Sequence, residues 1–309
     1  MEPCADQRTR ANRDELADRL GKAIQQNGIL DPIPGVRLAR SDQPTEKVFS
    51  SSRPSFCIVA QGAKEIYLGD SRYYYDADRY LVATVELPIT GRILEASPSR
   101  PYLGIRIEID QATVSSVMVE SGMTSPTSQG GARAMYVSVV SPDLIDATVR
   151  FVRLLETPSD ASVLMPLIKR EMVYRLLMGE QGDRLKHLPM LGGHSHRIAQ
   201  AVDRLKTQFD QPVNIEALAR DLGMSSSGFH HHFKAVMDMS PLQYQKVLRL
   251  QVARQLMLGE NLDASSAGYK VGYDNPSHFS RDYKKLYGNA PIRDVANLRG
   301  QAVTDLASR

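Results

Sequence analysis

The feature that most constrains this chain is an internal repeat between residues 214 and 291. A short apolar stripe at helical spacing ends at Gly223, and a stripe with the same spacing ends at Gly272, 49 residues later. Each glycine is followed by two aromatic residues four positions apart, which are Phe229 with Phe233 and Phe279 with Tyr283. Self-similarity at a fixed period indicates one supersecondary unit used twice. We call residues 214–241 the first copy and residues 263–291 the second copy.

Each copy has the pattern of a short helix, a turn with glycine and a second helix, which is the sequence form of a helix-turn-helix. Glycine suits the turn because it adopts a positive φ without steric cost. Ser225 can cap the second helix of the first copy, and Asn275 can cap that of the second copy, with Pro276 at the first helical position. The outward positions of both second helices are small, polar or basic, which favours contact with base edges in a major groove.

Residues 241–258 separate the two copies and carry an apolar stripe at helical spacing. A helix of this length spans about 27 Å, and successive major grooves on one face of DNA lie about 34 Å apart. Such a spacer can hold two reading helices in adjacent grooves. The alternative is a helical bundle that binds no nucleic acid. One copy alone would not decide between the two, whereas two copies on a stiff spacer favour DNA binding.

These residues resemble the DNA-binding domain of the AraC/XylS family, which has two helix-turn-helix units joined by a long helix. The most specific match begins at Gly272-Tyr273 and ends at Pro291, and it includes Phe279-Ser280-Arg281, Tyr283-Lys284-Lys285 and Gly288. The resemblance implies a bacterial transcription regulator that binds double-stranded operator DNA through both units, with RNA polymerase as a further partner.

The sequence departs from the family pattern in both copies. His231 stands where the family usually has arginine, and Asp238 stands where it has glycine. In the first helix of the second copy, larger apolar residues and alanine are replaced by Ala264, Ala267 and Gly268. Because these changes remove apolar volume, we expect that helix to be less well anchored than in the family.

The candidate DNA-binding residues follow from the outward positions and the resemblance. Base edges would be read by Ser226, Ser227, His230, Asn275, Ser277 and His278. Phosphates would be held by Lys234, Arg281, Lys284 and Lys285, and Ser225 and His231 complete the set. Residues 194–309 carry a net charge of +4 and the remainder −1, so the basic excess lies where a phosphate-binding surface requires it. Adjacent histidines 230–232 fan out on a helix and do not converge on one metal ion.

Before the repeat, the pattern changes from helical to strand-like. Leu16, Leu20 and Ile24 indicate an N-terminal helical segment over residues 1–28. Residues 29–120 contain short apolar runs broken by turn residues, and we interpret as strands Ser55–Gln61, Lys64–Leu68, Ser71–Tyr75, Arg79–Val85, Arg92–Glu95 and Tyr102–Ile109. Their close spacing indicates an antiparallel sandwich or barrel. The predicted class is therefore α+β, with a β-domain followed by an all-α domain.

Residues 30–110 resemble the N-terminal domain of a large subgroup of AraC-type regulators. The matching segments are Pro32–Gly35, Gln61–Lys64, Leu68–Asp70, Tyr80–Val82, Leu87-Pro88, Ala96–Pro98 and Pro101–Leu103. The resemblance implies a cupin-like β-barrel that senses an unknown small-molecule effector or oligomerises. Our candidate effector-binding residues are Arg53, Cys57, Tyr67, Tyr73, Tyr75, Glu86 and Arg106. Strand alternation puts Tyr73 and Tyr75 on one face, and either face can be the interior.

Cupins are often metalloenzymes, so the alternative function is a cupin-type enzyme with an accessory helical domain. The first histidine of the chain is His187, which excludes a histidine-ligated metal in the barrel. The sequence has no phosphate-loop, dinucleotide or nucleophile-elbow motif, and we expect no catalytic site, metal or cofactor. A third alternative is an architectural or protein-binding helical module. We interpret Cys57 as a small buried residue; the other possibility is a redox or electrophile sensor.

The remaining segments complete the predicted organisation. Residues 121–134 form a loop, 135–180 a helical dimerisation or packing segment, 181–193 a linker, 194–293 the DNA-binding domain and 294–309 a C-terminal tail. Because dimer contacts in the family often involve helices after the barrel, residues 142–179 are candidates for a homodimer interface; packing on the barrel is the alternative. The chain lacks a membrane-length apolar run and a secretory signal at its start, so we expect a cytoplasmic, nucleoid-associated protein.

Overall fold

A computed structural model describes residues 2–69, 71–124, 133–186 and 194–307. The chain divides into an N-terminal unit, residues 1–199 with 235–238, and a C-terminal unit, residues 200–234 with 239–309. Part of the predicted loop (125–132) and part of the predicted linker (187–193) lie outside the described residues. Each unit is described separately below.

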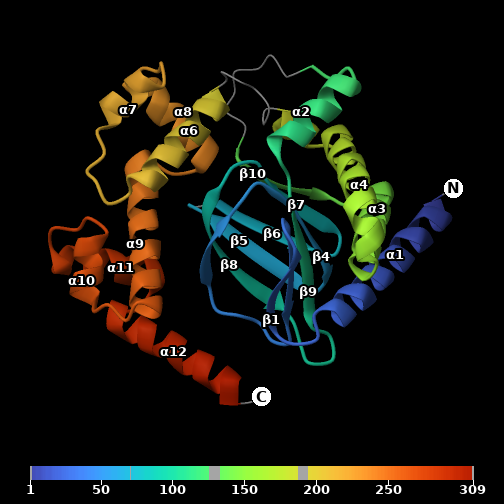
Figure 1. Ribbon diagram of the computed structural model, residues 1–309, viewed down its shortest axis with the longest axis horizontal. Coiled ribbons are helices and arrows are strands. Elements are labelled where there is room, and N and C mark those ends of the chain that lie inside the picture. Colours follow the sequence, from blue (N-terminus) through green and yellow to red (C-terminus); the bar gives the residue numbers. More distant parts are fainter. Residues whose placement is uncertain (1, 70, 125–132, 187–193, 308–309) are drawn as a thin grey trace. The chain divides into compact units, whose positions relative to one another are not determined.

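Two antiparallel sheets form the strand-rich part of the N-terminal unit (Figure 1). The larger sheet has the order β1 (Gly28–Ile33), β2 (Val36–Ser41), β9 (Tyr102–Glu108), β4 (Ser55–Gln61), β7 (Arg79–Ala83) and β10 (Met135–Val139). The smaller sheet has the order β3 (Val48–Ser52), β8 (Leu87–Glu95), β5 (Ala63–Leu68) and β6 (Ser71–Asp76). Strand β6 also contacts β4 and β7, so the smaller sheet lies against the larger one.

Each predicted strand overlaps a strand of the structure, which confirms the antiparallel β-domain and the α+β class. The predicted run Arg92–Glu95 is only the end of β8. The sequence analysis did not predict β1, β2, β3 or β10. Strand β1 contains Pro32 and is mostly exposed. Its sequence does not show the alternation of apolar and polar residues that identifies a half-buried strand.

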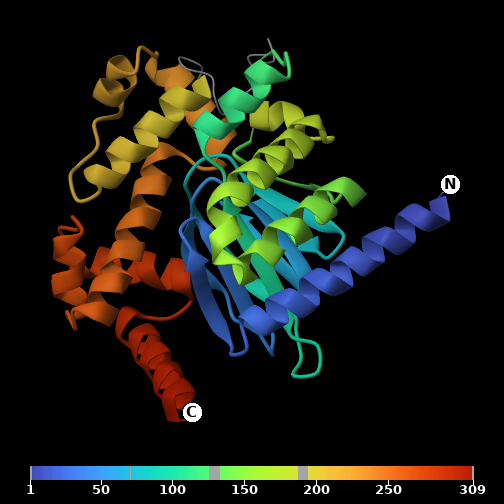
Figure 2. The same cartoon turned by 45° about the vertical axis from the view of Figure 1, so that its right-hand side comes forward.

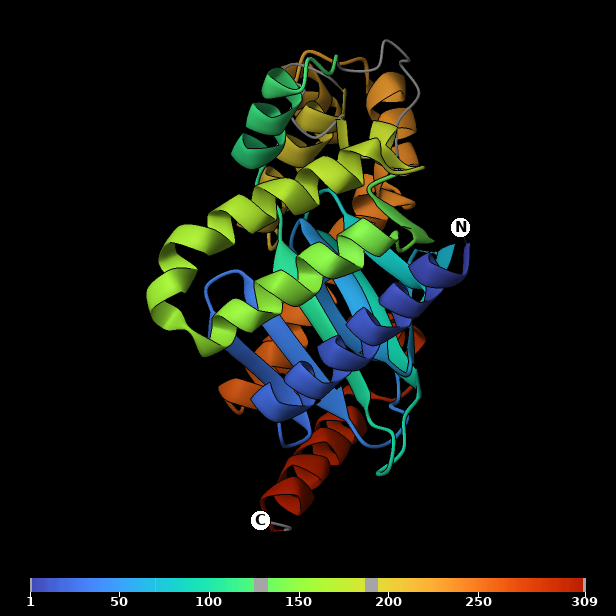
Figure 3. The same ribbon diagram turned by 90° about the vertical axis from the view of Figure 1, so that its right-hand side faces the viewer.

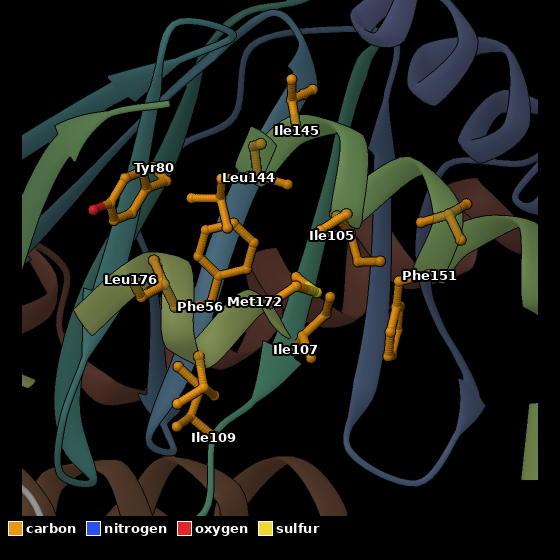
Figure 4. Packing of buried hydrophobic residues seen from close by; sticks show 14 of the residues in the cluster. Phe56, Tyr80, Ile105, Ile107, Ile109, Leu144, Ile145, Phe151, Met172 and Leu176 are labelled. Atoms are coloured by element: carbon orange, nitrogen blue, oxygen red, sulfur yellow. The ribbon is translucent and has the colours of Figure 1, made fainter. Parts of the chain in front are cut away.

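Three helices cover one face of the larger sheet (Figure 3). They are α1 (Glu2–Ala23), α3 (Pro142–Arg153) and α4 (Pro158–Met178). The predicted stripe is confirmed, because Leu16 and Leu20 on α1, and Ile24 directly after it, are buried in the core beneath these helices. Figure 4 shows how residues of β9 and β4 meet residues of α3 and α4 in that core, including Ile105, Phe56, Phe151 and Met172. The unit also contains α2 (Gln111–Glu120), η1 (Leu154–Glu156) and α5 (Gly182–Lys186).

The chain after residue 194 is helical in its described residues. Its helices are α6 (His194–Thr207), α7 (Ile215–Asp221), α8 (Ser226–Met237), α9 (Pro241–Gly259), α10 (Ala264–Lys270), α11 (Pro276–Tyr287) and α12 (Pro291–Ala307). Helix α9 is a rod with α6 and α7 at one end and α10 and α11 at the other (Figure 1 and Figure 2). Helix α12 occupies most of the segment that the sequence analysis treats as a tail.

Candidate functional site

The first copy folds as a helix-turn-helix made of α7 and α8. The Asn214 side chain accepts a hydrogen bond from the Ala217 N–H at 2.9 Å and so begins α7. Gly223 then turns the chain with φ 63°. The Ser225 hydroxyl oxygen accepts from the Gly228 N–H at 3.1 Å, which confirms the predicted cap at the start of α8. Local side-chain bonds of this kind satisfy the free N–H groups at a helix start.

The second copy repeats this geometry in α10 and α11. Gly272 turns the chain with φ 84°, and the Asn275 side chain accepts from the Ser277 N–H at 2.8 Å at the start of α11. Gly288 ends α11 with φ 80°. At the matching position of the first copy, Asp238 adopts φ 56°. The chain therefore keeps the left-handed conformation of the family glycine with aspartate, one of the residues that best tolerate it.

The aromatic pairs hold both copies to the body of the C-terminal unit. Phe229, Phe233, Phe279 and Tyr283 are all fully buried. The ring centroids are 5.6 Å apart in the first pair and 5.5 Å apart in the second. Their burial turns the opposite sides of α8 and α11 outward. The candidate residues that are exposed on these sides and at the helix starts are Ser225, Ser226, Ser227, His230, His231, Lys234, Asn275, Ser277, His278, Arg281, Lys284 and Lys285.

The expected weak anchoring of α10 does not occur. Ala267 is fully buried, and a Cβ atom at Gly268 would lie only 3.0 Å from Cγ of Phe279. The Phe279 ring therefore occupies the volume that larger side chains on α10 would fill. The small residues of α10 allow α10 and α11 to pack closely, so the apolar volume that α10 lacks is filled by Phe279.

Arg249 on α9 joins segments that lie far apart in the sequence. Its guanidinium donates to the carbonyl oxygens of Phe209 at 2.7 Å, Gln211 at 3.0 Å and Gly272 at 2.8 Å. Gln245, one turn earlier on α9, donates to Phe209 and Gln211 as well. Burial lowers the pKa of Arg249. Arg249 thus fixes the chain before the first copy and the turn of the second copy to the same face of α9.

Arg254 makes a second buried link, between α9 and α12. Its Nε and Nη2 donate to the two carboxylate oxygens of Asp294 at 2.8 and 2.9 Å. The Tyr283 hydroxyl donates to the same carboxylate at 2.8 Å. Asp294 is only 6% exposed, so the carboxylate is shielded from water. The sequence analysis assigned no role to Arg249 or Arg254.

A pocket of about 660 Å³ opens in the N-terminal unit beside the β1–β2 hairpin. Three candidate effector-binding residues line it, namely Arg53, Glu86 and Arg106. The pocket also contains residues that the sequence analysis did not select: Asp31, Arg37 and Glu108. The segment Pro32–Gly35, which resembles the family, also lines the pocket. Because Asp31 and Arg37 lie close to this segment in the sequence, the resemblance could have pointed to them. A pocket of this size falls in the range that binds small molecules.

Other candidates lie on the inner face of the two sheets. Cys57 is paired with Arg106 across β4 and β9, and Tyr75 is buried and hydrogen-bonded to Tyr102. Tyr73 lies two residues before Tyr75 on the same face of β6. Lys64, paired with Tyr75 across β5 and β6, belongs to this face too and was not selected. Lys64 can be assigned to the inner face only when its pairing with Tyr75 is known, because the sequence alone does not show which residues of β5 and β6 lie side by side.

Tyr67 is the candidate that the structure does not bring to the inner face. Its hydroxyl donates to the buried Glu65 carboxylate at 2.7 Å, and Arg72 also donates to that carboxylate. Although burial raises the pKa of Glu65, these hydrogen bonds and one from Arg92 lower it below its usual value. Tyr67 thus belongs to an ion-pair network on the other side of β5.

The surroundings of Cys57 disfavour a thiolate. Burial raises the pKa of the thiol, although Lys64 and a hydrogen bond with Ser55 act in the opposite direction. A reactive sensor cysteine requires a lowered thiol pKa. The geometry therefore disfavours the interpretation of Cys57 as a sensor, although the residue is half-buried and not fully buried as predicted.

Comparisons with known proteins agree with both halves of this geometry. The family described as "AraC-type transcriptional regulator N-terminus" matches residues 32–184, and a family described as "Helix-turn-helix domain" matches residues 218–294. The chain belongs to the AraC family of transcriptional regulators. The first match covers the inner face and every residue of the pocket lining except Asp31, and the second covers α8, α9 and α11.

Curated AraC-type relatives match over part of their length. The HTH-type transcriptional regulator ArgR of Pseudomonas aeruginosa is 27% identical over 128 residues, which are 41% of this chain and 39% of that protein. CdhR of the same organism is 24% identical over 124 residues, 40% of this chain and 37% of that protein. The chain therefore matches about two fifths of the length of these relatives, all of which are named as transcriptional regulators.

Solved structures share the AraC-family fold at low sequence identity. Apo ToxT from Vibrio cholerae has a TM-score of 0.54 at 9% identity, over 87% of this chain and 98% of that one. ToxT with a bound unsaturated fatty acid has a TM-score of 0.53 at 9% identity, over 88% of this chain and 97% of that one.

In the described part of this chain, no three His, Cys, Asp or Glu side chains gather as metal ligands would. None of the helices described is long and apolar enough to cross a membrane.

Proposed function

We propose that this AraC-family protein is a bacterial transcription regulator that binds operator DNA with α8 and α11 in adjacent major grooves. The observation that carries the proposal is the repeated helix-turn-helix on α9, with buried aromatic pairs and outward polar faces. Helix α9 has 19 residues and is therefore about 28 Å long. That length is close to the spacing of about 34 Å between successive major grooves on one face of DNA.

The exposed residues have the chemistry that each role requires. Hydroxyl, amide and imidazole groups at the starts of α8 and α11 suit hydrogen bonds with base edges; these belong to Ser226, Ser227, His230, Asn275, Ser277 and His278. Cations further along each helix suit phosphates; these are Lys234, Arg281, Lys284 and Lys285. Ser225 and His231 are exposed at the start of α8 and on it, and we propose that they contact the same groove. We also propose RNA polymerase as a partner of the protein on DNA.

Lys284→Ala tests the phosphate role directly. Removing one phosphate contact should weaken binding by a similar factor on every sequence and lower the slope of log affinity against log salt by about one. The operator is first selected from random duplexes, and affinities are then measured by mobility shift over a range of salt concentrations. The matched control is Lys270→Ala, because Lys270 is already paired with Glu260 at 2.9 Å and is assigned no phosphate. Equal binding of wild-type protein to all duplexes would overturn the proposal.

We further propose that the protein acts as a homodimer through α4. The described part of α4 exposes apolar side chains at Val163, Leu164 and Leu167, which are 65%, 43% and 58% exposed. Met172 and Leu176, further along the helix, are buried in the core, whereas Val163, Leu164 and Leu167 lie in its first half and stay exposed. A contiguous exposed apolar patch on a helix is typical of an interaction surface.

Leu167→Arg is expected to shift the protein toward monomer, with dimerisation weakened at least tenfold, because a charge would enter the apolar contact. Sedimentation velocity over a concentration series measures the change. Leu164→Met, which keeps an apolar side chain on the same patch, serves as the control. A wild-type protein that remains monomeric, or a Leu167→Arg protein that dimerises as well as the wild type, would contradict this interface.

The N-terminal unit is proposed to bind the small-molecule effector in the pocket between the β1–β2 hairpin and the inner face. Arg53, Glu86 and Arg106 line the pocket, and Cys57, Tyr73 and Tyr75 belong to the adjoining inner face. The protein would act on the nucleoid in the cytoplasm, where operator DNA lies.

A further inference from the structure

Two of the three arginine side chains in the pocket lining have a carboxylate partner, and the third does not. Arg37 is held by both carboxylate oxygens of Asp31 at 2.6 and 2.7 Å, and Arg53 lies 3.5 Å from the Glu108 carboxylate. Arg106 is the third guanidinium of the pocket. Within the described residues, no carboxylate lies within ion-pair distance of Arg106, and its Nε is buried without a hydrogen-bond partner.

The buried Nε–H of Arg106 is costly without an acceptor, because a buried polar group without a partner loses the free energy of hydration and gains nothing in return. The sheet register enforces this position. Arg106 stands between Arg37 on β2 and Cys57 on β4, and its neighbours Ile105 and Ile107 belong to the core under the helices. Since strand residues alternate in direction, Arg106 is directed to the inner face of the sheet.

A second cation shares this inner face. The Lys64 ammonium lies 6.0 Å from the centre of the Tyr102 ring, and among the described residues no carboxylate lies within ion-pair distance of it. Burial lowers the pKa of Lys64, as does the nearby charge of Arg106. The Tyr73 hydroxyl is buried without a hydrogen-bond partner. The inner face therefore presents two cations and a free hydroxyl, all of which stabilise an anion.

We infer that the pocket binds a ligand with a single carboxylate, which pairs with Arg106 in the pocket lining and is further stabilised by the nearby charge of Lys64 on the adjoining inner face. The inference rests on the proposed effector function and adds the chemical class of the effector. A planar guanidinium matches a carboxylate with two parallel hydrogen bonds. In the pocket lining, the carboxylates of Asp31, Glu86 and Glu108 offset the charges of the three guanidinium groups, so the lining has no excess positive charge that would favour a doubly charged phosphate ester over a monocarboxylate. An anionic ligand supplies the partner that Arg106 lacks.

Calorimetric titration of the full chain with two matched probe pairs tests this inference. The pairs are benzoate with benzamide and octanoate with octanamide, which differ in charge at nearly constant size. At least one carboxylate is expected to bind ten times more tightly than its amide. Arg106→Gln should abolish that preference, and Arg106→Lys should keep part of it. The control is Arg79→Gln, which removes a charge on β7 where Arg79 pairs with Asp76 at 3.3 Å.

Several results would overturn the inference. These are equal affinity for acid and amide, no binding of either acid by the wild-type chain, tighter binding of phenyl phosphate than of benzoate, or unchanged benzoate or octanoate affinity in Arg106→Gln. Circular dichroism and binding to the selected operator without any probe show whether each variant is folded. Operator binding by Arg106→Gln also separates this inference from the proposed regulator function, because DNA binding can succeed where carboxylate binding fails.

Discussion

Gly272→Ala is expected to destabilise the C-terminal unit by about 3–5 kcal/mol. Gly272 has φ 84°, a conformation that costs a residue with Cβ about 1–2 kcal/mol. The added Cβ would also lie 2.0 Å from the Asp210 carbonyl oxygen and 2.9 Å from the Arg249 guanidinium. The backbone must therefore move, and hydrogen bonds from a charged donor, each worth about 1.5–3 kcal/mol, are lost. Urea unfolding of the full chain, followed by hydrogen exchange of α9–α11, measures the loss.

Gly223→Ala is the internal control for this prediction. Gly223 occupies the equivalent turn of the first copy with φ 63°, but among the residues that the structure describes no heavy atom outside its immediate neighbours lies within 4 Å of the position that its Cβ would take. Only the backbone penalty of about 1–2 kcal/mol applies there. If the two variants lose the same stability, the close approach of Asp210 and Arg249 to Gly272 contributes nothing, and the proposed link between the copies is wrong.

Asp294→Ala is expected to cost a further large amount, about 3–5 kcal/mol, because it removes one partner of a buried ion pair. The Arg254 and Asp294 side chains are 15% and 8% exposed, and the Tyr283 hydroxyl would lose its acceptor at the same time. Burial raises the pKa of Tyr283, so this hydroxyl stays protonated and still needs an acceptor. Urea unfolding of the full chain, together with hydrogen exchange of α11 and α12, reports the loss.

Glu260→Ala is the matched control for Asp294→Ala. It also removes a carboxylate from an ion pair, with Lys270, but both side chains of that pair are more than half exposed. Exposed pairs contribute at most about 1 kcal/mol. Similar losses in the two variants would show that the burial of Asp294 does not matter.

Local patterns made the C-terminal unit predictable. The spacing of Phe229 with Phe233, and of Phe279 with Tyr283, depends only on residues in one helix, and the turn glycines depend only on backbone geometry. The hydrogen bonds of Arg249 could not be predicted in this way. Its acceptors lie 23 to 40 residues away in the chain, so they exist only after the helices have packed.

The N-terminal unit was less predictable for a related reason. Strands such as β4 and β9 have one apolar side and one polar side, and the sequence shows this alternation without showing which side faces the other sheet. Tyr67 and Lys64 illustrate the consequence, because β5 places them on opposite sides. Glycines add to the difficulty. Gly62, with φ 84°, turns the chain between β4 and β5. Alternation along the sequence therefore cannot be continued from Cys57 to Lys64 to predict which side Lys64 faces.

Under the proposed mode of DNA binding, the rod-like α9 also limits how the promoters that this protein binds can change over time. A helix advances about 1.5 Å and turns about 100° for each residue. The length of α9 therefore fixes both the distance and the angle between α8 and α11. Single-base insertions between the two contacted segments of a promoter would rotate one segment out of phase by about a tenth of a turn. Promoters in this regulon would therefore diverge by base substitution while the distance between the segments stays constant.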